Sequence, residues 1–193
     1  NQRLIEEAAA ATAEAQAAAE AEAQAAAERA AMAARQQALV DVQSALDAGA
    51  PFAEPLTALS GEMDVPAALS DVAESGVPTL AALQADFAGP ARDALDAARR
   101  ANAGDDPGER AMTFLQSQLG VRSLEPREGD SADAILSRAQ GAARAGDLAA
   151  AIEELQALPE PALAEMQGWI DRARTRVAAT QAADGLAASI ATN

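Results

Sequence analysis

Alanine content limits the kind of core that this chain can build. Of its 193 residues, 58 are alanine, whereas Val, Ile, Leu, Met, Phe and Trp together number 38. An alanine side chain buries little apolar area, and burial contributes only about 25 cal/mol per Å². Alanine nevertheless has the highest helix propensity, and aromatic residues make up 2% of the chain, too few for a sheet protein. The composition therefore predicts an all-α protein of elongated or multi-helix form.

The chain lacks most of the side chains that carry out chemistry near neutral pH. It contains no Cys, His, Tyr or Lys, which supply most nucleophiles and acid–base groups. It also has no G-x-S-x-G elbow, no phosphate-binding glycine loop and no H-E-x-x-H metal motif. We therefore expect no enzymatic activity, no cofactor, no bound metal and no small-molecule substrate.

The charge of the chain is strongly negative throughout. The net charge is −16, and residues 1–34, 35–130 and 131–193 carry −4, −9 and −3. A nucleic-acid-binding protein needs a basic face, so we expect no nucleic-acid partner. No window approaches the roughly 20 apolar residues of a membrane span. Because the chain starts at Asn1 within a helical pattern, we expect it to be part of a longer protein.

The positions of the prolines divide the chain. All nine lie between Pro51 and Pro161, which leaves residues 1–50 and 162–193 free to form long unbroken helices. An apolar column with a period of seven runs along the first of these. Its members are Leu4, Ala11, Ala18, Ala25, Met32, Leu39 and Leu46.

A coiled coil also needs a second apolar column, and the candidate here is mixed. That column consists of Ala8, Ala15, Glu22, Arg29, Gln36 and Gln43. The pattern predicts a weak, alanine-packed coiled coil over residues 1–48, with a single solvated helix as the alternative. The candidate interface residues on this helix are Leu4, Met32, Leu39 and Leu46.

Residues 49–106 are predicted to form a connector of short helices, several of which start near prolines. We place Pro78 at the first position of one such helix. Residues 107–127 are predicted to form an amphipathic helix and an extended link. Bulky apolar side chains on one face, with arginines at the ends, favour contact with lipid, although the same stripe could pack on the rest of the protein. The candidate lipid contacts are Arg110, Met112, Phe114, Leu115, Leu119 and Arg122.

Residues 128–193 form the most regular part of the sequence. Ser131 and Asp147 are N-cap candidates and Gly146 is a helix stop, which predicts a helical hairpin followed by a long terminal helix within a bundle. Trp169, the only Trp, lies one position off the apolar stripe and is either at the core edge or an interface anchor. The side chains expected to be most buried are Leu136, Ile152, Leu155 and Ile170. The cations expected either to be solvated on the helix surface or to pair singly with nearby acids are Arg172, Arg174 and Arg176.

Three stretches of this region resemble the mitofilin family in its alphaproteobacterial form. They read EGDSADAILSRAQ at 128–140, AGDLAAAIEELQAL at 145–158 and WIDRARTR at 169–176. The likeness continues upstream, more weakly, through residues 45–52 and 76–80. It begins near residue 35 and extends to the end of the chain.

The resemblance implies a protein anchored in the inner membrane, with a coiled coil and a C-terminal mitofilin domain on the periplasmic side. Members of that family bend and scaffold membranes, self-associate, and carry a lipid-binding amphipathic helix just before the domain. It also implies contacts with outer-membrane assembly machinery, whereas the CHCH-type partner of the mitochondrial proteins is not expected here. The expected function is a non-enzymatic membrane-shaping scaffold. The alternative is a soluble periplasmic protein–protein adaptor without lipid contact.

Overall fold

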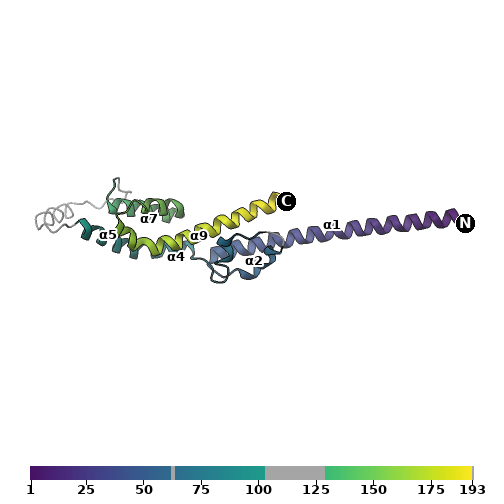
Figure 1. Ribbon diagram of the computed structural model, residues 1–193, viewed down its shortest axis with the longest axis horizontal. Helices are drawn as coiled ribbons and strands as arrows, with labels where there is room; N and C mark the ends of the chain where they lie inside the picture. Colours follow the sequence, from purple (N-terminus) through teal and green to yellow (C-terminus); the bar gives the residue numbers. More distant parts are fainter. Residues whose placement is uncertain (62–63, 103–128, 193) are drawn as a thin grey trace, which may run out of the picture.

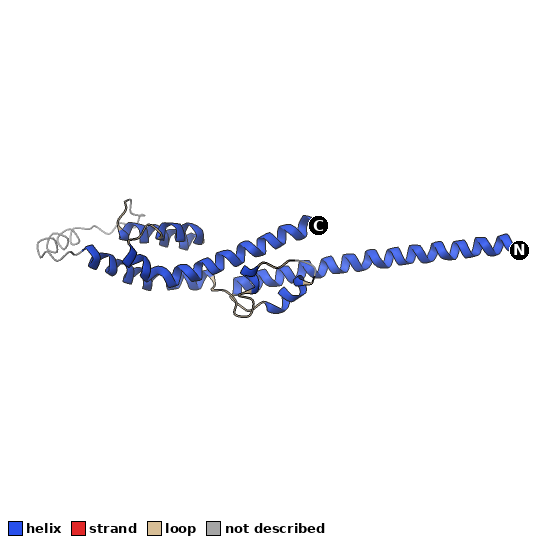
Figure 2. Ribbon diagram, viewed as in Figure 1, coloured by secondary structure: helices blue, strands red, loops and turns tan. Residues whose placement is uncertain are grey.

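The computed structural model describes residues 1–61, 64–102 and 129–192, and all regular structure in these ranges is helical (Figure 2). The predicted all-α class is confirmed, as are the long N-terminal helix, the C-terminal helical hairpin and the long terminal helix (Figure 1). In chain order the helices are α1 (Gln2–Ala48), α2 (Ala53–Ser60), α3 (Ala67–Ser70), α4 (Leu80–Asp86), α5 (Ala88–Asn102), α7 (Ala132–Ala145), α8 (Leu148–Leu155) and α9 (Glu160–Thr192).

Local capping chemistry sets several helix ends where the sequence predicts them. Gly49 ends α1 in the left-handed conformation (φ 69°), which only glycine adopts at little cost. The Ser131 hydroxyl accepts a hydrogen bond from the Ala134 amide, and the Asp147 carboxylate accepts one from the Ala150 amide. The predicted start at Pro78 is wrong. Thr79 is the N-cap of α4 instead, because its hydroxyl can accept the Ala82 amide proton, as an N-cap side chain should.

The helix α9 passes through two separate hydrophobic cores. Its 33 residues span about 50 Å at 1.5 Å per residue. Its N-terminal half packs with α4, α5, α7 and α8 in what we call the head core. Its C-terminal half packs with the end of α1 and with α2 and α3 in the base core. On α9 the head core includes Met166, Trp169 and Ile170, and the base core includes Ala179, Ala183, Leu186 and Ile190.

Neither core is confined to one of the predicted segments. The head core combines helices from 49–106 with helices from 128–193, and the base core also takes in the end of 1–48. Leu136, Leu155 and Ile170 are buried as predicted. Ile152 is only half-buried, because the eight-residue α8 buries the face formed by Leu148, Ala151 and Leu155.

Hydrogen bonds and ion pairs of polar side chains join the helices of the head core at its edges. Arg138 Nε lies 2.9 Å from Glu154 Oε2 and joins α7 to α8. Gln84 Nε2 donates to the Ala143 carbonyl at 2.9 Å, which joins α4 to the end of α7 at a carbonyl that also accepts from the Gly146 amide. Arg172 Nη1 lies 2.7 Å from Asp86 Oδ2 and joins α9 to α4.

Of the glycines that the structure describes, Gly76 has the least room for a side chain. Its φ is +72°, and a Cβ there would lie 2.7 Å from the Gly49 carbonyl oxygen and 2.8 Å from that of Ala50. Gly76→Ala should therefore destabilise the protein by at least about 2 kcal/mol through left-handed strain and backbone overlap. In contrast, Gly168 lies within α9 with open space around it. Gly168→Ala should stabilise the protein by about 0.5–1 kcal/mol. Urea unfolding followed by circular dichroism measures both, and equal stability of the two variants would contradict this assignment.

Candidate interaction surfaces

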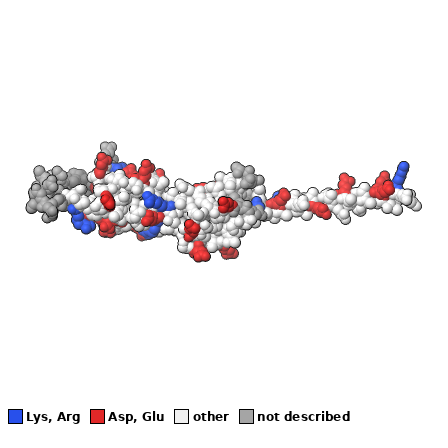
Figure 3. Space-filling view, viewed as in Figure 1, with Lys and Arg blue, Asp and Glu red and all other residues white. Residues whose placement is uncertain are grey.

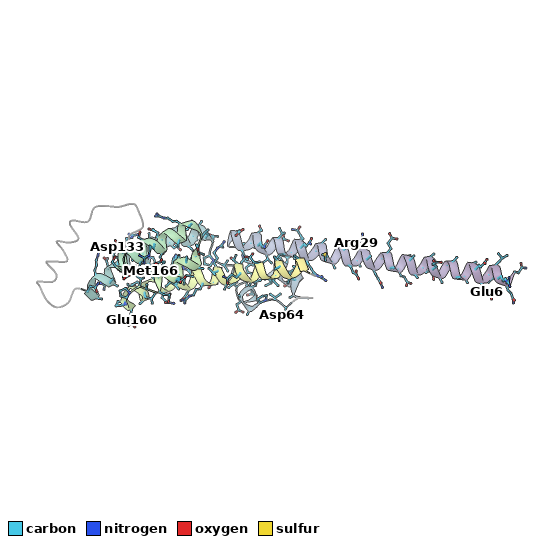
Figure 4. All side chains as sticks on the ribbon, turned by 90° about the horizontal axis from the view of Figure 1, so that it is seen from above. Glu6, Arg29, Asp64, Asp133, Glu160 and Met166 are labelled. Carbon is cyan, nitrogen blue, oxygen red and sulfur yellow. The ribbon has the colours of Figure 1, made fainter. Side chains whose placement is uncertain are left out.

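Among the described residues, the N-terminal part of α1 forms a long exposed surface. Residues 2–37, which we call the arm, are exposed except for partial cover at Ala25, Ala31 and Arg35. Their length is about 54 Å at 1.5 Å per residue, and they extend beyond both cores (Figure 1). Glu6 and Arg29 lie on this projecting part, past the end of α9 (Figure 4).

An uncharged stripe runs along the arm in continuation of part of the face that α1 buries at its base. That face packs through Ala38, Leu39, Val42 and Leu46. Heptad steps back from Ala38 and Leu39 lead mostly to small or apolar residues, which we call the arm stripe, although Gln24 and Arg3 interrupt the Ala38 column. Heptad steps back from Val42 lead instead to Arg35, Glu28, Ala21, Glu14 and Glu7, so the stripe continues only part of the buried face. The arm stripe consists of Leu4, Ala10, Ala11, Ala17, Ala18, Ala25, Ala31 and Met32.

The structure corrects part of the predicted coiled-coil interface. Leu4 and Met32 are 67% and 40% exposed and remain available to a partner. Leu39 and Leu46, however, are buried in the base core of their own chain. They pack against helices of the same chain because α9 runs beside α1 there, which leaves them inaccessible to a second protein.

Trp169 is a core residue, and its predicted alternative role as an interface anchor is wrong. It is 1% exposed. Its ring meets Phe87 edge to face, with centroids 5.0 Å apart and planes at 86°, and its Nε1 donates to the Leu83 carbonyl at 2.8 Å. Trp169 lies one position off the apolar stripe and is still fully buried, because α9 does not bury a single face but packs against α4, α5 and α8 at once.

The predicted lipid-binding segment lies outside the described residues. This holds for all of its candidate contacts, which are Arg110, Met112, Phe114, Leu115, Leu119 and Arg122. The helices that flank it in the sequence, α5 and α7, are described. Both lie at the end of the molecule opposite the tip of the arm (Figure 1).

Two open grooves lie on the head. One of about 430 Å³ runs between α5 and α7, where Leu95 and Leu136 contribute apolar walls beside Arg92 and Asp133. Another of about 270 Å³ lies where the start of α8 meets α9. Neither collects a set of groups suited to acid–base or nucleophilic catalysis.

Charged side chains are spread over the molecule. In the face shown in Figure 3, acidic side chains are scattered along the arm and over the bundle, with uncharged surface between them. Over residues 1–61, 64–102 and 129–192, no group of three or more acidic residues is arranged to hold a metal ion. In the same ranges, no helix combines the length and the apolar character that crossing a bilayer requires.

Comparisons of the chain with protein-family models, with curated proteins and with solved structures found no match. The fold seen here is an elongated helical bundle with a long projecting helix. The functional proposals below therefore depend on the residues of this chain and on the resemblance of its C-terminal segments.

Proposed function

We propose that this protein is a non-enzymatic membrane-shaping scaffold of the mitofilin type. In this proposal it acts at the inner membrane from the periplasmic side, by self-association and by contact of an amphipathic helix with lipid. The observation that supports it most is the arm, a helical segment of 36 residues with an uncharged stripe, exposed except for partial cover at Ala25, Ala31 and Arg35. Most helices in proteins owe their stability to packing of such a face, so a partner helix is the natural occupant.

The partner that we propose for the arm stripe is the arm of a second copy. The stripe continues part of a face that already packs against helices at its base, and its small residues allow close approach of two helices. A column with a period of seven drifts by about 20° per heptad around a straight α-helix. The two arms would therefore wind around each other with a left-handed supercoil. Burial of alanine contributes little energy, so the association is weak for each pair.

Lipid contact is proposed for residues 109–122, where the resemblance implies the lipid-binding helix. Two arginines contribute only about 1 kcal/mol each near an anionic surface, and the net charge of −16 opposes them. Attachment must therefore depend on insertion of Met112, Phe114, Leu115 and Leu119. Because α5 and α7 lie opposite the tip of the arm, pairing of two arms leaves that end of the molecule uncovered.

The paired change Phe114→Asp with Leu115→Asp tests this lipid site. Each large apolar side chain contributes about 1.5–3 kcal/mol on burial, so the partition onto vesicles of phosphatidylethanolamine and phosphatidylglycerol should fall at least tenfold. Co-sedimentation measures that partition. Val40→Asp, a change at an exposed position of α1, is the matched control and should bind like the unaltered protein. Binding that survives the paired change contradicts the assignment, and loss of the folded state assigns the two residues to the core instead.

The second candidate function is a soluble periplasmic adaptor. The groove of about 430 Å³ between α5 and α7 favours it, because its apolar walls and flanking charges suit a peptide from a partner protein. An adaptor of this kind stays in the supernatant with vesicles of any composition, whereas the scaffold sediments with them. Outer-membrane assembly machinery is the class of partner that the resemblance implies for either function.

A further inference from the structure

The two cores meet at a compact junction near the end of α1. The segment Val77–Thr79 leads from the base core to the head core, and α9 passes beside it. Gly49, the cap of α1, approaches this segment so closely that a Cβ there would lie 2.8 Å from Thr79 Cγ2 and 3.0 Å from the Val77 carbonyl oxygen. The end of α1 is thus in contact with the connection between the cores.

Arg176 joins the three segments of this junction. Its side chain is 12% exposed. Nη1 donates to the Leu46 carbonyl at 2.9 Å and to the Pro78 carbonyl at 3.2 Å, and Nη2 lies 3.3 Å from Asp47 Oδ1. One guanidinium on α9 therefore holds the last turn of α1 and the connecting segment together.

The neighbouring arginines of α9 make no comparable set of contacts. Arg172 is 43% exposed and pairs with Asp86 inside the head. Arg174 is 51% exposed and lies 3.9 Å from Asp171 of its own helix. Arg176 thus has the most buried side chain of the three and the one that contacts α1.

Close to Arg176, the apolar contact between α1 and α9 depends on small side chains of α9. Near Arg176, the residues that α9 contributes to the base core are Ala179 and Ala183, with Leu186 and Ile190 further along. Small side chains interlock little, so they fix the sliding of one helix along another poorly. Hydrogen bonds of a charged guanidinium to fixed carbonyls are strong and depend on geometry. A single polar group at a helix interface can set the register of two helices, at a cost in stability.

We propose that Arg176 is the positioning residue that fixes the register and direction of α1 relative to α9, and with them the orientation of the arm on the head. The inference concerns described residues of a single chain. It therefore stands or falls independently of self-association and of lipid binding.

Distances between spin labels test this proposal, because the chain has no native Cys. Val40→Cys on α1 and Gln156→Cys after α8 are both exposed and report on the arm and the head. Labelled protein diluted into unlabelled protein gives intrachain distances alone. Adding Arg176→Ala should broaden or shift the distance distribution by at least half a helical turn, about 3 Å. Adding Arg172→Ala, which removes an ion pair of the head, should leave the distribution narrow.

Three results would overturn the proposal: an unchanged narrow distribution in folded Arg176→Ala, equal broadening in Arg172→Ala, or broadening in Asp47→Ala. Broadening in Asp47→Ala would count against the proposal because the Asp47 carboxylate is 83% exposed. The two hydrogen bonds from Arg176 to main-chain carbonyls should therefore be enough to hold α1 in place. If Arg176→Ala does not fold, Arg176→Gln removes the charge and the guanidinium fork while keeping a polar side chain. Its distance distribution is then judged by the same criterion.

Discussion

Trp169→Ala should lower the free energy of unfolding by about 3–5 kcal/mol, as large-to-small changes of a buried aromatic residue do. The change removes the edge-to-face contact with Phe87 and leaves the Leu83 carbonyl without its indole donor. Small domains are stable by only about 5–15 kcal/mol, and among the described residues the other buried aromatic side chains are those of Phe52 and Phe87. We expect most of its head core to be unfolded or close to it at 37 °C.

Far-UV circular dichroism in urea measures this loss, since the substitution removes the only Trp and its fluorescence. Trp169→Phe is the matched control. It keeps an aromatic ring beside Phe87 but loses the hydrogen bond, which should cost about 1–3 kcal/mol through the unsatisfied carbonyl. A Trp169→Ala protein within about 1 kcal/mol of the unaltered one would show that Trp169 is not central to the head core.

The helix ends could be predicted from sequence because capping depends on a few adjacent residues. Gly49 supplies a left-handed backbone, and Ser131 and Asp147 supply acceptor oxygens three residues before the amides that they bind. Each of these signals acts over one turn of helix. The burial of Trp169 is different, because it depends on Leu83 and Phe87, which lie more than 80 residues earlier in the chain.

The heptad column could not show where α1 stops packing against other helices of the same chain. Its apolar spacing is the same at Leu4 and at Leu46. What separates the two is the C-terminal half of α9, which covers the base of α1 and not the arm. The proposed role of Arg176 could not be predicted from the sequence either. Two of its acceptors are main-chain carbonyls, which every residue possesses, so nothing in the sequence distinguishes it from Arg172 and Arg174.

If the arms pair as proposed, replacing both Leu4 and Met32 with Asp should leave the protein monomeric at low micromolar concentration, where the unaltered protein should be associated. Both are the large, exposed residues of the arm stripe, and two aspartates per chain would place like charges within the paired arms. Sedimentation velocity measures the change. Ile5→Asp with Val40→Asp is the matched control, because these residues are also large and exposed but lie beside the stripe, and it should leave the assembly intact.

The salt dependence of association provides an independent test of pairing through the arm stripe. Residues 1–34 carry a charge of −4, so two paired arms repel each other. Raising the salt concentration from about 0.1 M to about 1 M shortens the Debye length from about 10 Å to about 3 Å, and the association should therefore tighten. Deletion of residues 1–34 removes all but the last three residues of the arm, keeps the base-core residues of α1, and should abolish both the assembly and its response to salt. If the Leu4 and Met32 variant still sediments as an oligomer, the copies associate through another surface.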